Sequence, residues 1–265
     1  MDNQSKPLTY ISYLRLDELL TLQRPRSDGP EHDEMLFIVI HQVYELWFKQ
    51  VLHELRHLRG QFESGTTTGA LATLKRVLTI LKTLVAQVDV IETITPMSFN
   101  SFRARLEAAS GFQSHQFREL EFLLGHKRPE MVEHYAAGSP VRATLEHLLE
   151  EPTVFDAFLY YLGQQGHAVP KGALTRDLRA PLVPSAEVQE LLLAVYQRAD
   201  FSAQVCERLV DLDEGLQEWR YRHVKMVERT IGAKPGTGGS AGAEYLRQTL
   251  FKPLFPDLWE IRSRL

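Results

Sequence analysis

The chain has 265 residues and a mass of 30.4 kDa, with a formal net charge of −4 and a pI near 6.2. This slightly acidic balance argues against nucleic acid as a partner, because phosphate binding needs a clustered basic surface. One cysteine, Cys206, excludes an intramolecular disulfide and any site built on several cysteines. No fully apolar run exceeds six residues, and the start MDNQSKPLTY has no apolar signal-peptide region. We therefore expect no membrane span and a cytoplasmic location.

The first long helix is predicted from residue 30 to about residue 59. Pro30 suits a first helical turn, where its missing N–H costs nothing. Apolar residues follow at the three- and four-residue spacing of a helical stripe: Leu36, Ile40, Val43, Trp47, Val51, Leu55 and Leu58. Between Met35 and Phe48 apolar side chains nearly encircle the helix, which predicts deep burial of this part.

A second helical stripe follows, and Pro96 is expected to stop it. Its apolar members are Leu71, Leu74, Leu78, Leu81, Leu84, Val85, Val88 and Ile91. Shorter helical patterns lie at about 99–107, 114–124, 141–149 and 153–162.

The Pro- and Gly-rich stretch 163–184 is expected to connect helices within one domain. The last long helix is predicted from residue 201 to residue 231, with Gly232 as its C-terminal stop. Sustained period-two alternation of β-branched residues is absent, so no strand is predicted. The sequence predicts a single all-α domain of long antiparallel helices.

Three local features could carry chemistry, and the first is an H-E-x-x-H pattern at His53, Glu54 and His57. Two histidines four residues apart share a helix face, and the glutamate between them could act as a general base in a zinc hydrolase. A catalytic zinc site, however, needs a buried face. Here the apolar stripe runs through Leu55 and Leu58. We expect the two histidines on a solvated face and keep zinc hydrolysis as an alternative.

The second feature is His41, which projects from the same helix face as Phe37, four residues earlier. A histidine in such an apolar segment is usually a core residue with a satisfied hydrogen bond. The alternative is a histidine that lines a pocket, with Phe37 beside it to stack against an aromatic ligand.

The third feature is His223, on the apolar face of the final long helix and one turn after Trp219. A neutral imidazole on a helix inside a bundle is a usual proximal ligand of haem iron. A purely structural histidine stays open on local evidence.

A glycine-rich stretch at 234–242 follows this helix. It looks like a phosphate loop, but it lacks the G-K-[ST] ending and no strand precedes it. Such a loop can place backbone N–H groups and the Thr237 hydroxyl close to an anionic or zwitterionic ligand. A buried arginine would complete such a site, and Arg103 follows Phe99 by one helical turn.

Taken together and in this order, these segments resemble the bacterial tryptophan 2,3-dioxygenase family over nearly the whole chain. The matching segments are YISYLRLD (10–17), HDEMLFIVIHQ (32–42), ELW (45–47), SGFQS (110–114), QFR (116–118), WRYRH (219–223) and GTGGS (236–240).

The resemblance implies that the helices enclose a b-type haem, with iron in the ferrous state when active and with O2 as co-substrate. His223 falls on the axial ligand of the haem iron, and Ser110 and Gly111 match a turn close to the haem. His41 falls on the distal histidine, which hydrogen-bonds the indole N–H of the substrate.

The resemblance also implies the groups that bind L-tryptophan. Phe37 falls on the aromatic residue beside the indole. Arg103 falls on the arginine that pairs with the substrate carboxylate, and Thr237 on the threonine that contacts its ammonium and carboxylate. Position 99 carries Phe or Tyr in the family. Here it is Phe99, so no tyrosine hydroxyl helps to hold the carboxylate.

The first segment, residues 1–29, is implied to leave the catalytic domain, residues 30–265, and to enter the neighbouring subunit's pocket. Tyr10, Tyr13 and Leu14 match the family residues that do so. The resemblance therefore implies a homo-oligomer, a tetramer by analogy.

The implied reaction is cleavage of the indole C2–C3 bond of L-tryptophan by O2 to give N-formylkynurenine, the first step of tryptophan degradation by the kynurenine route. The alternatives are a haem-dependent oxygenase of a substituted tryptophan or an indole, and a haem-binding protein without turnover.

Overall fold

The computed structural model of the chain describes residues 7–29, 31–238 and 242–265. Pro30, and Gly239, Ser240 and Ala241 of the glycine-rich stretch, lie outside the described residues. Within the described ranges the chain is helical and contains no strand, which confirms the all-α class. No helix in these ranges is both long enough and apolar enough to cross a membrane.

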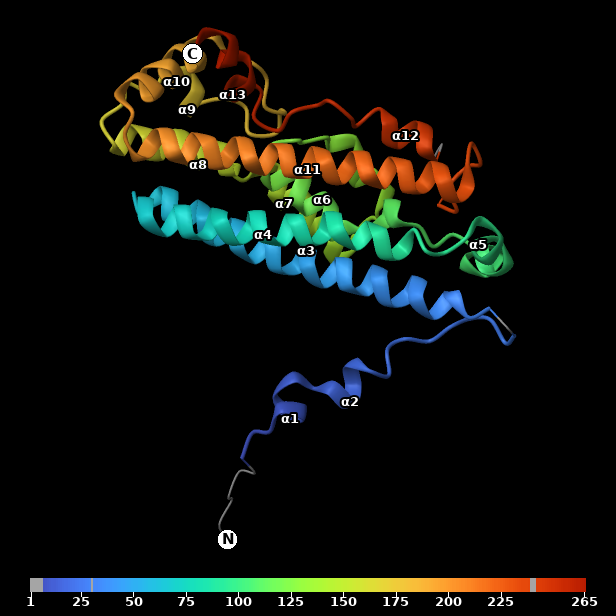
Figure 1. The fold of residues 1–265 in the computed structure, drawn as a ribbon. Coiled ribbons are helices and arrows are strands. Elements are labelled where there is room, and N and C mark those ends of the chain that lie inside the picture. Colours follow the sequence, from blue (N-terminus) through green and yellow to red (C-terminus); the bar gives the residue numbers. More distant parts are fainter. Residues whose placement is uncertain (1–6, 30, 239–241) are drawn as a thin grey trace.

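Three long helices form the frame of the molecule (Figure 1): α3 (Asp33–Glu63), α4 (Thr67–Ile91) and α11 (Phe201–Ile231). A short turn joins α3 to α4, and the two run antiparallel. In contrast, α11 runs parallel to α4, since Gly215 lies beside Leu81 and Arg222 donates to Asp89 about two turns further along both helices. The predicted antiparallel arrangement thus holds for α3 with α4, but it is wrong for α4 with α11.

The main core lies where the apolar stripes of these helices meet. Leu55, Leu74 and Leu209, one from each long helix, are fully buried. Aromatic rings extend this core toward α8 (Val154–Gln164), where Phe62 packs against Phe158. Burial of such large side chains stabilises each helix by about 1.5–3 kcal/mol per side chain.

Shorter helices cover this frame: α5 (Pro96–Arg103), α6 (His115–Leu123), α7 (Pro140–Glu150) and α8 (Val154–Gln164), with short 3₁₀ helices at Ala104–Leu106, Gly111–Gln113, Pro129–His134 and Ile261–Arg264. Side-chain caps fix several of their starts, as when Ser114 accepts from the backbone N–H of Phe117. Pro96 does not stop α4, which ends at Ile91. Instead it is the first residue of α5, where a proline is well accommodated.

The connection predicted at 163–184 contains one short helix, α9 (Lys171–Leu174), and is followed by a helix that the sequence analysis missed, α10 (Ala186–Arg198). Its buried residues Val188, Leu191, Leu192 and Val195 have helical spacing, so the signal was present. Two short helices close the chain: α12 (Ala243–Arg247) and α13 (Pro256–Glu260).

A buried carboxylate ties the C-terminal segment to the middle of α11. Asp213 accepts from the backbone N–H groups of Leu254 (2.8 Å) and Phe255 (3.0 Å) and from Nε1 of Trp259 (2.9 Å). These bonds satisfy donors that would otherwise be buried without partners. They therefore fix the C-terminal segment against the helix that carries His223.

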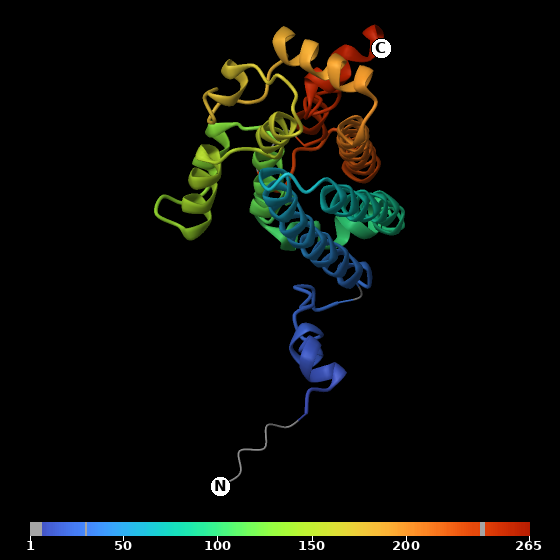
Figure 2. The same cartoon turned by 90° about the vertical axis from the view of Figure 1, so that its left-hand side faces the viewer.

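Residues 7–29, which we call the N-terminal arm, project from the helical body (Figures 1 and 2). The arm contains two short helices, α1 (Tyr10–Leu14) and α2 (Leu16–Leu19). Its apolar side chains face solvent: Leu8 is 78% exposed, Tyr10 74% and Tyr13 72%. The arm therefore has no apolar core of its own.

The first half of α3 is less buried than predicted. Met35, Val39 and Leu46 lie on one face of the helix and are exposed, whereas Ile40 and Phe48 are buried on the side that packs against the chain. The prediction of deep burial from Met35 to Phe48 is thus wrong for a single chain, because the chain covers one side of this segment only.

Candidate active site

His41 lies in the third turn of α3, where its imidazole is held by the backbone of the preceding turn. Its Nδ1 lies 2.7 Å from the carbonyl oxygen of Phe37, and the two rings pack with centroids 4.2 Å apart. A carbonyl oxygen only accepts, so Nδ1 carries the proton and Nε2 is left as an acceptor. Burial lowers the pKa of His41 below its usual value, which keeps the ring neutral near pH 7.

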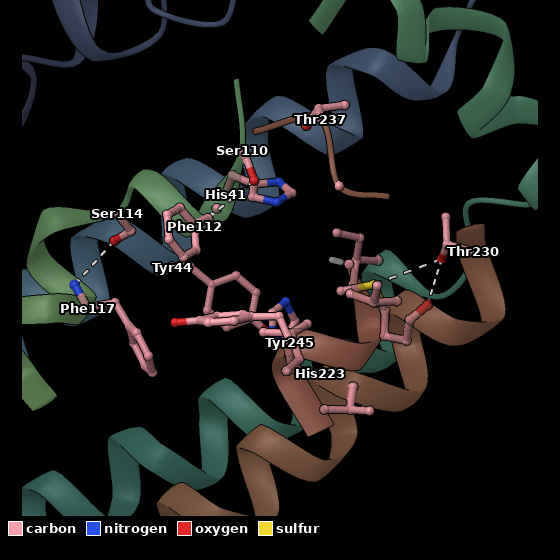
Figure 3. Close-up of a pocket in the computed structure, with 18 of the residues that line it drawn as sticks. His41, Tyr44, Ser110, Phe112, Ser114, Phe117, His223, Thr230, Thr237 and Tyr245 are labelled. Atoms are coloured by element: carbon pink, nitrogen blue, oxygen red, sulfur yellow. Dashed lines mark hydrogen bonds between the residues drawn. The ribbon is translucent and has the colours of Figure 1, made fainter. Parts of the chain in front are cut away.

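His223 faces the same space from α11 (Figure 3). Trp219, one turn earlier, stacks on the imidazole with ring centroids 5.1 Å apart. Burial lowers the pKa of His223 to about 4, and the nearby His41 contributes in the same direction. His223 is therefore a neutral imidazole, the form that binds metals.

Between the two histidines lies a cavity of about 270 Å³, which we call the histidine cavity. Apolar and aromatic side chains form most of its wall, with polar groups at a few points, as is usual for small-molecule sites. The site residues predicted within residues 30–265 all line it: Phe37, His41, Phe99, Arg103, Ser110, Gly111, Thr237 and His223.

Helix α5 brings Phe99 and Arg103 to this cavity. Phe99 packs against Phe37, with ring centroids 5.6 Å apart, and so continues the aromatic wall beside His41. Arg103 is only half-buried, contrary to the buried arginine that the sequence predicted. Its Nη2 donates to the carbonyl oxygen of Pro235 over 2.5 Å, because α5 ends beside the glycine-rich stretch.

The segment after α5 meets the glycine-rich stretch at a second point. Ser110 caps the 3₁₀ turn that begins at Gly111, and Thr237 donates its hydroxyl to the carbonyl oxygen of Ala109 over 2.5 Å. A Cβ atom on Gly238 would lie 2.6 Å from the Cβ of Ser110, so only glycine permits this approach. The two segments thus form one wall of the histidine cavity.

Sequence reasoning missed a cluster of charged residues on the cavity wall. The carboxylate of Glu121 accepts from the guanidinium groups of Arg118, Arg128 and Arg220, and Glu121, Arg118 and Arg220 are almost fully buried. Burial alone would raise the pKa of Glu121, but the three arginines hold it below its usual value. The Nε atoms of Arg118 and Arg128 have no hydrogen-bond partner among the described residues. Three cations that share one anion make this wall positive, a property that no spacing in the sequence revealed.

Three predicted site residues do not lie at the histidine cavity of the same chain. Tyr10, Tyr13 and Leu14 belong to the exposed arm, and none of them lines the cavity.

The H-E-x-x-H segment has no metal-site geometry. His53 and His57 are exposed as predicted, whereas Glu54 is buried and pairs with Arg76 at 2.9 Å. The described residues contain no group of three or more His, Cys, Asp or Glu side chains that could hold a metal ion. The geometry therefore does not support the zinc alternative.

The fold and the cavity define a class of protein: an all-helical protein in which two neutral histidines, from different helices, face one apolar pocket for a small ligand. The sequence model of the family described as tryptophan 2,3-dioxygenase matches residues 1–150 and 179–265. The chain belongs to this family.

Curated relatives with the name tryptophan 2,3-dioxygenase agree with this assignment. The relative from Herpetosiphon aurantiacus is 59% identical over 98% of this chain and 100% of its own length. The relative from Anaeromyxobacter sp. (strain K) is 61% identical over 98% and 97%. A more distant one, from Saccharopolyspora erythraea, is 44% identical over 98% and 94%.

Proposed function

We propose that the chain is a haem-dependent dioxygenase that cleaves the indole C2–C3 bond of L-tryptophan with O2 to give N-formylkynurenine. The observation that carries the proposal is the pairing of His41 and His223 across one apolar cavity, with Arg103 and Thr237 on its wall. This set of groups offers one ligand for a metal, one acceptor for an N–H group and two contacts for an amino acid.

The residues present fit a haem. His223 is neutral and stacked in place by Trp219, so its nitrogen is available to bind iron. Arg118 and Arg128 have buried Nε atoms without partners, which suits the carboxylates of the haem. When bound, haem supplies the iron chemistry that activates O2 and opens the ring.

His41 would position the indole. Because its Nδ1–H donates to the Phe37 carbonyl oxygen, its Nε2 can accept the indole N–H. Its lowered pKa favours this neutral acceptor over a charged imidazolium. Phe37 and Phe99 provide aromatic faces for the indole ring, and the apolar wall excludes water from it.

Arg103 and Thr237 would bind the amino-acid end of the substrate. A guanidinium pairs well with a carboxylate, and a hydroxyl can contact both the carboxylate and the ammonium group. In the free chain both groups bond to backbone carbonyl oxygens, of Pro235 and Ala109. Tryptophan would therefore replace the bond from Arg103 to a neutral carbonyl by an ion pair with its carboxylate.

The arm would complete the site of a neighbouring subunit in a homo-oligomer, a tetramer by analogy with the family. The exposure of Tyr10 and Tyr13 and of the Met35–Val39–Leu46 face of α3 supports this part of the proposal. An apolar surface of this kind normally marks an interface.

The test is an absorption experiment on the haem-loaded ferrous protein with L-tryptophan and O2, followed at the absorbance of N-formylkynurenine. We expect tryptophan-dependent O2 uptake and product in equal amounts. A Soret band without uptake would instead indicate a haem-binding protein without turnover, and turnover of substituted tryptophans or indoles alone would change the substrate. His223→Ala should lose haem, whereas His53→Ala, an exposed histidine, should keep it. Full haem content in His223→Ala would overturn the axial assignment.

A further inference from the structure

The junction between the N-terminal arm and α3 contains a buried carboxylate whose partners all belong to the arm. Glu34, the second residue of α3, is 1% exposed. It accepts from the backbone N–H groups of Arg26 (2.7 Å) and Ser27 (2.9 Å) and from the Ser27 hydroxyl. No ion pair involves Glu34 within the ranges that the structure describes.

Burial of a carboxylate without a cation is costly unless hydrogen bonds compensate it. Burial alone would raise the pKa of Glu34, but its bonds to Arg26 and Ser27, together with the charge of the nearby Arg105, hold the pKa below its usual value. The carboxylate and this short piece of backbone therefore depend on each other: without the arm, Glu34 would lose every side-chain hydrogen bond that it makes with the described residues.

Other bonds fix the same part of the arm. The Gln42 side chain donates to the carbonyl oxygen of Leu22 over 3.2 Å and accepts from Gln23 over 2.5 Å. Between the arm and α3, Glu31 pairs with Arg105, just after α5, at 2.7 Å. Residues 22–29, which we call the arm base, are thus attached to the helical turns that carry Phe37 and His41.

The rest of the arm behaves differently. Residues 7–21, which we call the arm tip, bond only within the arm, as in the Arg15–Glu18 pair. No hydrogen bond or ion pair joins the described part of the tip to the helical core of the same chain. The arm therefore consists of a fixed base and a tip that extends away from the core (Figure 2).

We propose that Glu34 is a positioning residue of the active site: by fixing the arm base it sets the direction in which the arm tip leaves, so that Tyr10 and Tyr13 reach the tryptophan site of a second copy. This inference rests on the proposed function, in which the tip completes a neighbour's site. If the eight residues of the arm base were not fixed, the tip could move over about 15 Å. This movement would lower the effective concentration of the tip at the tryptophan site of the second copy.

The test is Glu34→Gln in the full-length, haem-loaded protein. The glutamine amide can accept one of the two backbone N–H groups, but its own NH2 opposes the other. We expect the KM for tryptophan to rise about tenfold, with haem content and the Soret band unchanged. The amides of Arg26 and Ser27 should exchange with solvent faster. Ser27→Ala, which removes only the hydroxyl bond, should shift both readouts in the same direction by less.

Glu54→Gln is the matched control, because Glu54 is a buried carboxylate of the same helix that pairs with Arg76 and not with the arm. It should lower the unfolding temperature without changing KM. If it raised KM as much as Glu34→Gln does, the effect would be general destabilisation of α3 and the proposal would be wrong.

Mixed oligomers test whether Glu34 affects the active site of its own subunit or that of a neighbouring subunit. Co-expression of Glu34→Gln with His223→Ala leaves haem only in the Glu34→Gln subunits, whose sites can then receive an intact arm from the other variant. A KM that returns toward the unsubstituted value supports the proposal, and a KM that stays raised overturns it.

Amide exchange separates this inference from the proposed function. If the unsubstituted protein did not turn over tryptophan, faster exchange at Arg26 and Ser27 would still support the fixed base, and unchanged exchange would refute it.

Discussion

The helical core and the arm tip differ in whether their side chains are buried against the same chain. In the core, buried charges find partners in the same chain: Lys127 donates to the carbonyl oxygens of Leu149 and Glu151, and Asp213 accepts three N–H groups. In the tip, large side chains such as Tyr10 and Tyr13 are exposed to solvent. The difference indicates that the core can fold as one chain, whereas the tip sequence suits a surface that a single chain does not supply.

The local helices of the arm lead to the same conclusion. α1 has five residues and α2 has four. Isolated helices shorter than about 12–15 residues are marginal in water, and most helical stability comes from packing. The tip therefore needs a docking surface to hold its shape, and the exposed Met35–Val39–Leu46 face shows that the core offers apolar surface for subunit contacts.

Removal of residues 1–21, which include the arm tip, should cause the largest change in activity. The tip makes no hydrogen bond with the described core, so helix content, unfolding temperature of the subunit and haem binding should persist. Turnover of tryptophan should fall by about a thousandfold, on the order of 4 kcal/mol of transition-state stabilisation. Steady-state kinetics and circular dichroism would check both parts, and normal kcat/KM in the truncated protein would remove the tip from the site.

Asp213→Ala, in contrast, should lower the stability of the helical core. It leaves three buried N–H donors without their acceptor, so we expect unfolding to become easier by about 3 kcal/mol. Urea denaturation measures this, with Asp211→Ala as control. Asp211, an acid of the same helix, has a side chain that is 41% exposed and pairs with Arg208, so its loss should cost less than about 1 kcal/mol. Equal losses in the two variants would show that the Asp213 bonds contribute nothing specific.

The sequence was sufficient for the core wherever one helix face carries all the apolar residues. The predicted bounds of α11, 201 to 231, and its stop at Gly232 agree with the structure. The first half of α3 was misjudged because apolar residues on two faces predict burial without saying which molecule provides it. The prediction that Pro96 stops the second helix is wrong because a proline that ends one helix and a proline that begins the next look alike in sequence.

Part of the histidine cavity could be predicted, because some of its residues are neighbours on one helix face. Phe37 with His41, and Trp219 with His223, are neighbours on one helix face, and such pairs are visible in the sequence. The arginine cluster around Glu121 was not visible, since Arg220 comes from a helix about a hundred residues further along the chain. Long-range charge contacts of this kind have no periodicity. The half-burial of Arg103 also depends on contacts between distant segments, here with Pro235.

Arg103→Leu should weaken tryptophan binding, by less than a fully buried arginine would. A charge pair broken on one side costs roughly 2–5 kcal/mol when it is buried. Because Arg103 is half-buried, we expect about 2 kcal/mol, a roughly thirtyfold rise in the Kd for tryptophan. Spectral titration of the haem-loaded protein measures it. Arg229→Leu, an exposed arginine that does not line the cavity, is the control, and an unchanged Kd in Arg103→Leu would remove this residue from the site.

The smallest expected effect is on the pH dependence of stability. Burial lowers the pKa of His126 to about 4, although Glu121 opposes this shift, and Arg220 donates to its Nδ1 over 3.4 Å. The unfolded chain takes up a proton near pH 6.5, whereas the folded chain resists it until about pH 4. Stability should therefore be unaffected above pH 6.5, fall as the pH drops from 6.5 toward 4, and then level off.

His126→Asn removes this titration while its amide oxygen can still accept from Arg220. Between pH 7 and pH 4.5 the variant should lose less unfolding free energy than the unsubstituted protein, by roughly 1–2 kcal/mol after allowance for partial exposure. His53→Asn, an exposed histidine of α3, is the control and should leave the slope unchanged. If His126→Asn left the slope unchanged as well, the acid sensitivity of the core would come from other groups, and the arginine-rich wall would not resist protonation of its neighbour.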